Sequence, residues 1–376
     1  MKLERFELER IQSENENEVD INLSESGVEP MSVQELIAGN LDAEELLQTR
    51  LGYPQTNGTP LLREEIAAIY DGASADTVFV TNGGAEANFL TVWSILHENP
   101  ERKEVVMMQP NYMQIHGITA ASGGEVRPFW VRVRDGRWAP DIEELKKLVS
   151  RKTAAVAVCN PNNPTGAILT AEEMRAIAEI ADDAEAWVIS DEVYQGAEMT
   201  GGKTPSMFGL SERVIVTNSL SKAYGLPGLR LGWAVTHSRE HAELLWSYSD
   251  YVTISPTMLS DMLATIALQP LMRAKILRRT RNIVTKHWAI MKQWLDAHED
   301  IFDYVAPQAA SICFPKHNLE ASSSDFVARL LREKSVLLIP GEHFGFPHYF
   351  RFGFGHSIPK LKMGLKRIDE LLATLH

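Results

Sequence analysis

Short apolar runs that alternate with helical patterns are the feature that most constrains the fold of this chain. Each run is four to six residues long and rich in valine, isoleucine and other strand-forming residues. The runs are VFVT at 78–81, VVMM at 105–108, VRPFWV at 126–131, TAAVAV at 153–158, WVIS at 187–190 and VIVT at 214–217. This alternation is typical of a largely parallel sheet covered by helices. The sequence therefore predicts an α/β protein.

The pattern changes after about Leu268, which indicates a second structural unit. A long charged helical stretch from Leu271 to His298 comes first, and a final helix ends the chain. Between them are three strand-like segments, SICFP at 311–315, VLLIP at 336–340 and HYFRFGFG at 348–355. We expect a smaller α+β domain here, joined by the N-terminal segment. The expected division is 1–45 for that segment, 46–268 for the large domain and 269–376 for the small domain.

Charge and cysteine content exclude several classes of partner. The chain has 37 basic and 50 acidic residues, a net charge of −13, which disfavours nucleic acid and anionic membranes as partners. Cys159 and Cys313 lie in apolar surroundings without CxxC spacing, so neither a disulfide nor a metal site is expected. No apolar run approaches the ~20 residues of a membrane helix. These features favour a reducing, cytoplasmic location.

The segment SLSKAYGLPGLRLG, residues 219–232, carries the first candidate for chemistry. The strand VIVT ends just before Lys222, so the lysine is expected at the end of the sheet, where α/β proteins place ligands. A lysine amine attacks carbonyls only when it is unprotonated, and a Schiff-base lysine needs neighbours that lower its pKa. Arg230 could reach an anionic group on the same molecule. A lone lysine in a Ser/Gly loop is more often a surface residue, so other sites must support this interpretation.

Three more candidates follow predicted strands. TNGGAEA at 81–87 places the amides of Gly83, Gly84 and Ala85 at the start of a helix expected from Asn88 to His97, which suits a phosphate. PNY at 110–112 puts Tyr112 just past a strand, where its ring can cover a planar ligand. NPNNPTG at 160–166 forms a turn in which the Asn163 amide can donate a hydrogen bond. Each pattern alone is also found in ordinary turns and packing contacts.

Two further candidates complete the set. SDEVY at 190–194 places Asp191 at a strand end, where a carboxylate keeps a pyridine nitrogen protonated, and Tyr194 nearby, where a phenol can bond a ring oxygen. HYFRFGFG sets Arg351 among aromatic residues, and a buried guanidinium needs a partner such as a carboxylate. A lysine for an aldehyde, an aspartate for a pyridinium and an arginine for a carboxylate are together the complements of pyridoxal 5′-phosphate (PLP) and an amino acid.

The motifs, in this order and spacing from about Leu51 to Gly355, resemble the fold-type I PLP enzymes and in particular the class I/II aminotransferases. The resemblance implies a three-layer large domain with a mostly parallel sheet. It also implies that Lys222 forms the Schiff base and moves the substrate Cα proton, and that Asp191 pairs with the pyridine nitrogen. The remaining implied roles are ring-oxygen contacts for Tyr194 and Asn163, stacking for Tyr112, the phosphate site for Gly83, Gly84, Ala85, Ser219, Ser221 and Arg230, and the substrate α-carboxylate for Arg351.

One further match concerns assembly. In the resembling family, the tyrosine aligned with Tyr53, within GYPQTNGTPLLREEIA, reaches the phosphate of the neighbouring subunit. The resemblance therefore implies a homodimer. In contrast, NLSESGVEPMS at 22–32 departs from the glycine-rich segment of many relatives, so the substrate side-chain pocket cannot be inferred by analogy.

Transamination between an L-amino acid and a 2-oxo acid is the first functional hypothesis. The alternative is a PLP-dependent lyase or cyclase acting at Cβ or Cγ, because SESGV, DYVTISPTMLS and PGEHFG resemble a subgroup that contains capreomycidine synthase. A non-catalytic regulator related to these enzymes would need a DNA-binding module or a lost lysine, and neither is seen. A nicotinamide reductase is disfavoured because no GxGxxG motif opens the sheet.

Overall fold

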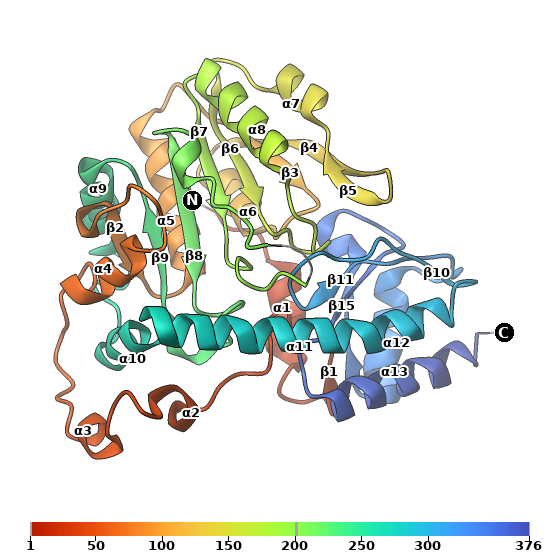
Figure 1. The fold of residues 1–376 in the computed structure, drawn as a ribbon. Helices are drawn as coiled ribbons and strands as arrows, with labels where there is room; N and C mark the ends of the chain where they lie inside the picture. Colours follow the sequence, from red (N-terminus) through yellow and green to blue (C-terminus); the bar gives the residue numbers. More distant parts are fainter. Residues whose placement is uncertain (1, 200–201, 376) are drawn as a thin grey trace.

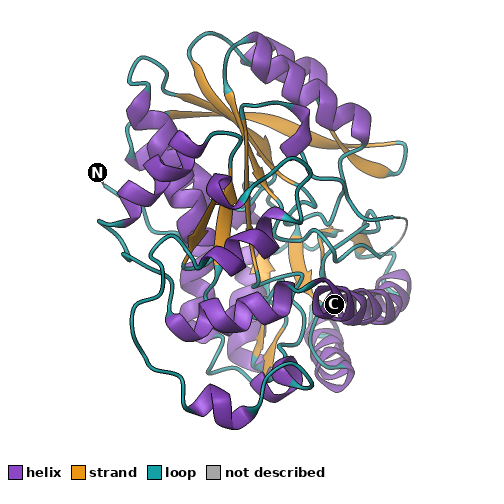
Figure 2. Cartoon of the chain, turned by 60° about the vertical axis from the view of Figure 1, so that its left-hand side comes forward, coloured by secondary structure: helices purple, strands orange, loops and turns teal. Residues whose placement is uncertain are grey.

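The structure, a computed structural model, describes residues 2–199 and 202–375. An eight-stranded sheet forms the centre of the larger part, with helices on both faces (Figure 1). In Figure 2 the strands run through the middle of the molecule and the helices surround them. The fold is the predicted α/β class.

The large sheet has the order β2-β9-β8-β7-β6-β3-β4-β5. Its members are β2 (Val78–Thr81), β3 (Glu104–Gln109), β4 (Glu125–Arg134), β5 (Arg137–Pro140), β6 (Thr153–Cys159), β7 (Trp187–Asp191), β8 (Val214–Ser219) and β9 (Gly232–Val235). The five neighbouring strands β4, β3, β6, β7 and β8 pair in parallel. In contrast, β2, β9 and β5 pair antiparallel with their neighbours. All six predicted strands are present. The sequence prediction missed β5 and β9, which are only four residues each and contain Pro140 and Gly232, respectively.

Side chains of β3 show how the sheet separates two apolar layers. Val105 and Met107 are buried in the core with α5, while Val106 and Met108 are buried in the core on the opposite face. This alternation follows from the two-residue period of a strand. A strand that is apolar on both faces must be covered on both sides, and this produces the three layers.

Most of the helices around this sheet alternate with its strands in the chain. They are α4 (Pro60–Ala67), α5 (Gly84–Glu98), α6 (Gln114–Ala121), α7 (Ile142–Leu148), α8 (Ala171–Asp183), α9 (Arg239–Ser249) and α10 (Met258–Leu268). Thr170 caps the start of α8 in a capping box with Glu173, and Thr59 caps α4 ahead of Pro60. The observed α5 begins at Gly84, four residues before the predicted start.

A separate apolar core lies in the C-terminal part of the chain. Its elements are β10 (Phe302–Asp303), β11 (Ile312–Cys313), β12 (Lys316–His317), α12 (Ser323–Lys334), β13 (Val336–Leu337), β14 (Ile339–Pro340), β15 (Phe350–Gly353) and α13 (Ile358–Leu372). The 27-residue helix α11 (Pro270–Asp296) runs from beside α10 to this part (Figure 1). Phe350 and Phe352 of β15 are buried in this second core.

The N-terminal segment contacts both parts. Ile21 in β1 (Ile21–Asn22) pairs with Val336 in β13, and Leu23 joins the second core. Ahead of it, α1 (Glu7–Asn15) lies between the two parts, and α2 (Val33–Ile37) and α3 (Ala43–Leu47) follow. The sequence did not predict α1, which is rich in charged residues. No helix in the described ranges is both long and apolar enough to cross a bilayer.

Candidate active site

The cavity that holds the candidate residues opens at the carboxyl ends of three adjacent parallel strands. Cys159, Asp191 and Ser219 are the last residues of β6, β7 and β8, and all three line it. Ligands bind at this edge in open α/β sheets. The cavity has a volume of about 320 Å³. Its other lining residues are Leu8, Glu9, Gln12, Ser13, Glu16, Glu25, Ser26, Gly84, Ala85, Asn88, Tyr112, Gln114, Asn163, Val193, Tyr194, Ser221, Lys222, Pro227, Arg230 and Arg351.

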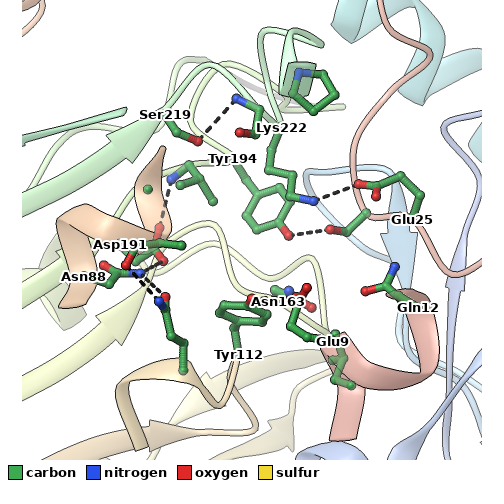
Figure 3. A pocket seen from close by; sticks show the side chains of 18 of the residues that line it. Glu9, Gln12, Glu25, Asn88, Tyr112, Asn163, Asp191, Tyr194, Ser219 and Lys222 are labelled. Atoms are coloured by element: carbon green, nitrogen blue, oxygen red, sulfur yellow. Dashed lines mark hydrogen bonds and ion pairs between the residues drawn. The ribbon is translucent and has the colours of Figure 1, made fainter. Parts of the chain in front are cut away.

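Lys222 forms an ion pair with Glu25 inside this cavity. Its Nζ donates to Oε1 of Glu25 over 2.7 Å, and the backbone N–H of Gly27 donates to the same oxygen over 2.8 Å (Figure 3). Burial lowers the pKa of Lys222, but the Glu25 carboxylate raises it and the net shift is upward. The expectation of neighbours that lower the lysine pKa is therefore wrong for this arrangement, because a carboxylate favours the ammonium form.

Glu25 responds in the opposite direction. Burial by itself raises its pKa, yet Lys222, the Gly27 amide and Arg351 together lower the pKa of Glu25 to about 2. The carboxylate is therefore ionised throughout the neutral range. The two side chains are 27% and 31% exposed, so the pair is partly shielded from water and its attraction is stronger than that of a surface pair.

Asp191 is held by a network of hydrogen bonds from two neighbouring elements. Nδ2 of Asn88 on α5 donates to Oδ2 of Asp191 over 3.1 Å, and the Val193 amide donates to Oδ1 over 3.2 Å. Oδ1 of Asn88 in turn accepts from Thr217 over 2.6 Å. Burial raises the pKa of Asp191, and these donors lower it in part. A protonated ring nitrogen is a partner that would favour the ionised form.

Two tyrosines, Tyr194 and Tyr112, line the cavity, and the hydroxyl of each has a hydrogen-bond partner. The hydroxyl of Tyr194 donates to Oγ of Ser26 over 2.9 Å, and burial raises the pKa of Tyr194 to about 12. Tyr112 packs its ring 5.0 Å from Phe6, centroid to centroid, and its hydroxyl donates to Glu9 over 2.6 Å. Burial and the Glu9 carboxylate likewise raise the pKa of Tyr112. Both phenols therefore stay protonated at neutral pH.

An anion-binding corner is built where α5 begins. Gly83 precedes the first helical residue with φ of +89°, and a Cβ at this position would lie 2.7 Å from Nη2 of Arg230. A Cβ at Gly232 would lie 2.5 Å from the backbone nitrogen of Gly84. Only glycines allow this close approach of the guanidinium, β9 and the helix start. Free amides and an arginine at a helix N-terminus suit a phosphate.

Arg351 is the most deeply buried cation of the cavity, with 1% of its surface exposed. Nη1 donates to Oδ1 of Asn163 over 3.0 Å, and Nη2 donates to the carbonyl oxygen of Ser24 over 2.6 Å. Its Nε has no hydrogen-bond partner among the described residues. A buried guanidinium with an unused donor can bind a carboxylate.

The structure brings nearly all predicted site residues to one place. The residues that line the cavity are Gly84, Ala85, Tyr112, Asn163, Asp191, Tyr194, Ser219, Ser221, Lys222, Arg230 and Arg351. Gly83 lies directly beside Arg230. Tyr53 does not line the cavity and is 81% exposed.

Sequence reasoning missed several cavity residues, and three groups of them bear on the chemistry of the site. Asn88 could have been found from its position one helical turn after Gly84, on the side of α5 that faces the sheet. The second group is Glu9, Gln12 and Glu16, whose spacing of three and four residues places them on one helical face. Glu25 had no local signal, because its partner Lys222 is 197 residues away in the chain.

Comparison with known proteins assigns the class of protein. Residues 18–368 match the family of class I and II aminotransferases. The chain belongs to this family of PLP-dependent fold-type I enzymes, and its cofactor is PLP.

Individual relatives include more than one kind of enzyme. The chain is 30% identical to capreomycidine synthase of Streptomyces vinaceus over 357 residues, which are 94% of this chain and 90% of that protein. A solved PLP-dependent aminotransferase from Streptococcus suis superimposes with a TM-score of 0.92 at 31% identity, covering 100% of this chain and 99% of that one. A solved PLP-dependent cyclase, OrfR, gives a TM-score of 0.90 at 27% identity, with 100% and 98% covered. The family is therefore certain, whereas the reaction differs among these relatives.

The residues of the cavity fit PLP. The corner at Arg230 and Gly83 suits its phosphate, the buried Asp191 suits its ring nitrogen, and Lys222 offers an amine for its aldehyde. When bound, PLP supplies an electron sink for the charge that develops at the substrate Cα.

Proposed function

We propose that the protein is an aminotransferase that moves an amino group between an L-amino acid and a 2-oxo acid. The observation that carries the proposal is the placement of Lys222, Asp191 and Arg351 around one cavity, with the Nε of Arg351 unused. An amine, a buried carboxylate and a carboxylate-binding guanidinium are what an amino acid substrate of a PLP enzyme requires.

Each residue has a defined task in this proposal. Arg351, oriented by Asn163, binds the α-carboxylate of the substrate. Nζ of Lys222, once displaced by the substrate amine, takes the proton from the substrate Cα as a general base. Asp191, held by Asn88, keeps the ring nitrogen protonated.

The remaining site residues are assigned to cofactor binding. Tyr194 and Asn163 bond the ring oxygen, and Tyr112 covers the ring face. The phosphate contacts are those of Gly83, Gly84, Ala85, Ser219, Ser221 and Arg230. The geometry at the start of α5 supports this set, since it combines free amides with a guanidinium.

The test is a half-reaction. The purified, PLP-loaded protein is mixed with one L-amino acid in the absence of a 2-oxo acid, and the cofactor absorbance is followed. A transaminase converts the cofactor to its pyridoxamine form and releases one equivalent of 2-oxo acid. A protein that performs this step with no amino acid of a broad panel is not an aminotransferase.

A second candidate is a lyase or cyclase that acts at Cβ or Cγ. It is supported by 30% identity to capreomycidine synthase and by the TM-score of 0.90 with a PLP-dependent cyclase. Such an enzyme also binds the substrate carboxylate and removes the Cα proton, and it differs in the group that leaves afterwards. The same half-reaction separates the two: a lyase or cyclase forms product repeatedly from the amino acid alone, and its cofactor returns to the aldehyde form.

The proposal includes a homodimer, with the domain limits 1–45, 46–268 and 269–376. Tyr53 lies outside its own cavity and is 81% exposed, as expected of a residue that serves a neighbouring subunit. Leu47, Leu51 and Tyr251 are also at least 80% exposed, and large apolar side chains that gather on a surface mark interaction sites. Sedimentation of the PLP-loaded protein tests the assembly.

A further inference from the structure

The cavity is lined by more carboxylates than cations. Four carboxylates and three cations line it. They are Glu9, Glu16, Glu25 and Asp191 on one side, and Lys222, Arg230 and Arg351 on the other. Among them, only Lys222 and Glu25 form an ion pair with each other. Binding of cofactor and substrate changes which of these charged groups have a partner of opposite charge.

The proposed function, on which this argument rests, supplies partners for four of the seven. Arg230 faces the phosphate, Asp191 faces the ring nitrogen and Arg351 faces the substrate carboxylate. Lys222, displaced by the substrate amine, acts as a general base and is therefore a neutral amine that offers no ammonium to Glu25. Three carboxylates, all glutamates, are then left without a cation.

The three glutamates come together from two segments. Glu9 and Glu16 are seven residues apart on α1 and its C-cap, so they lie on the same face, with Gln12 between them. Glu25 approaches from the strand-like segment after β1. In Figure 3, Glu9 and Gln12 lie on the helix beneath the Lys222–Glu25 pair.

Glu9, Glu16 and Glu25 line the same cavity and influence one another electrostatically. Burial raises the pKa of Glu16, and the neighbouring carboxylates of Glu25 and Glu9 raise it further. Within the described residues, neither Glu9 nor Glu16 forms an ion pair, and the Glu9 carboxylate accepts a hydrogen bond only from Tyr112. Glu9 and Glu25 are partly buried, whereas Glu16 is exposed. Like charges that line one cavity repel one another unless a cation joins them.

In the proposed function, Arg351 determines where the α-carboxylate of the substrate lies. Its guanidinium is 1% exposed, lines the same cavity and has an unpartnered Nε. A ligand carboxylate at Arg351 fixes one end of an amino acid. The other end of that molecule then lies within a cavity of about 320 Å³ whose free charges are negative.

We propose that the substrate side chain ends in a positively charged group, an amine or a guanidine, and that Glu9, Glu16 and Glu25 bind it. Charge-assisted hydrogen bonds to carboxylates are the strongest neutral-pH contacts available to such a group. A neutral side chain of equal length would leave the three carboxylates unpaired, and an anionic one would be repelled.

The test uses pairs of amino acids that share shape and differ in charge. The PLP-loaded protein is titrated with L-arginine against L-citrulline and with L-lysine against L-norleucine, without a 2-oxo acid. Dissociation constants come from the change in cofactor absorbance, and calorimetry measures any amino acid that leaves the absorbance unchanged. We expect the cationic member of at least one pair to bind tenfold or more tightly, and the pair that does so identifies guanidine or amine.

Substitutions on α1 and at its C-cap test which carboxylates bind the cationic group. Glu16→Gln keeps the shape of the side chain and removes its charge, so it should weaken binding of the cationic amino acid at least fivefold and leave its neutral counterpart unchanged. Glu14→Gln is the matched control, because Glu14 is exposed as Glu16 is and lies two residues before it, but pairs with Arg5 and does not line the cavity. Glu9→Gln is a second variant that removes the charge of a glutamate lining the cavity.

Four outcomes overturn the inference, and the last of them also rejects the proposed function. Equal or tighter binding of citrulline and norleucine overturns it while the proposed function stands. An equal loss in Glu14→Gln and Glu16→Gln also overturns it, because the effect would then be one of net charge rather than contact. A protein that binds none of these amino acids, yet converts its cofactor with an anionic or small one, likewise excludes a cationic substrate but not transamination. Failure with every amino acid rejects both proposals.

Discussion

The side-chain amide of Asn88 donates to the carboxylate of Asp191 over 3.1 Å and joins the first turns of α5 to the end of β7. Because Thr217 donates to the other side of the same amide, the orientation of Asn88 is determined and its nitrogen must face Asp191. The carboxylate is thereby fixed in position before any ligand arrives, which is the preorganisation that catalysis requires.

Replacing Asp191 by asparagine should reduce turnover far more than stability. A neutral amide cannot keep a ring nitrogen protonated, so we expect a loss of a hundredfold or more, ~2.7 kcal/mol of transition-state stabilisation. Asn88→Ala leaves the carboxylate and its bond from Val193, so a smaller loss of about tenfold is expected. Steady-state rates and urea unfolding of both variants give the comparison. Turnover of Asp191→Asn within about threefold of the parent, ~0.7 kcal/mol, would contradict the assigned role.

Lys222→Ala should abolish turnover and the absorbance of lysine-bound cofactor. In the cofactor-free protein it also removes the cation beside Glu25, so the free energy of unfolding of that form should fall by ~1–2 kcal/mol at neutral pH. The double variant Lys222→Ala/Glu25→Gln should recover that stability but no turnover. Denaturant unfolding and borohydride trapping of the cofactor measure the two effects. If Lys222→Ala still yields a borohydride-stable link to the protein, another lysine holds the cofactor.

Tyr53→Phe tests the shared site. Loss of one hydrogen bond to a charged phosphate corresponds to about 1.5–3 kcal/mol, roughly a ten- to hundredfold weaker cofactor affinity. Removal of PLP should shift the parent protein toward monomer on dilution, since a ligand bound across two subunits stabilises their association. Cofactor titration and sedimentation of parent and variant are the measurements. Tyr304→Phe is the control, because that hydroxyl contacts Asp296 away from the cavity. A fully active monomer would exclude the shared site.

Glu192 should make stability depend on pH. Burial raises its pKa from 4.5 to about 7, although Met207, Ser206 and Ser190 donate to its carboxyl group and lower the pKa in part. The native state holds this proton up to about pH 7, whereas the unfolded chain releases it near pH 4.5. The free energy of unfolding therefore falls as pH rises through this window, by up to about 3 kcal/mol.

Glu192→Gln removes that titration and keeps an oxygen for the three donors. Relative to the parent, the variant should be more stable at pH 8 and lose the advantage toward pH 5. Urea unfolding at several pH values measures the difference, and Glu179→Gln on the exposed side of α8 is the control. A constant difference across pH 5–8 would show that Glu192 is not the titrating group.

The sequence determined the α/β class and most of the candidate site by local rules. Asp191 ends a strand and Lys222 and Asn163 each follow one, and in a parallel sheet the carboxyl ends of successive strands lie at one edge. Local order therefore specifies spatial proximity, which is why these residues could be predicted together. The short strands β5 and β9 lacked such a pattern, because their positions depend on pairing with neighbours.

Only the tertiary structure decided the charge environment of the cavity. Glu25 meets Lys222 across 197 residues, and Glu9 meets Tyr112 across 103. No periodicity or motif encodes such contacts, since they arise when the N-terminal segment pairs through β1 with β13 and brings α1 over the cavity. The direction of the Lys222 pKa shift follows from that placement. A pKa depends on the distances to charges and water in the folded chain, and these distances do not exist until the two ends of the chain have come together.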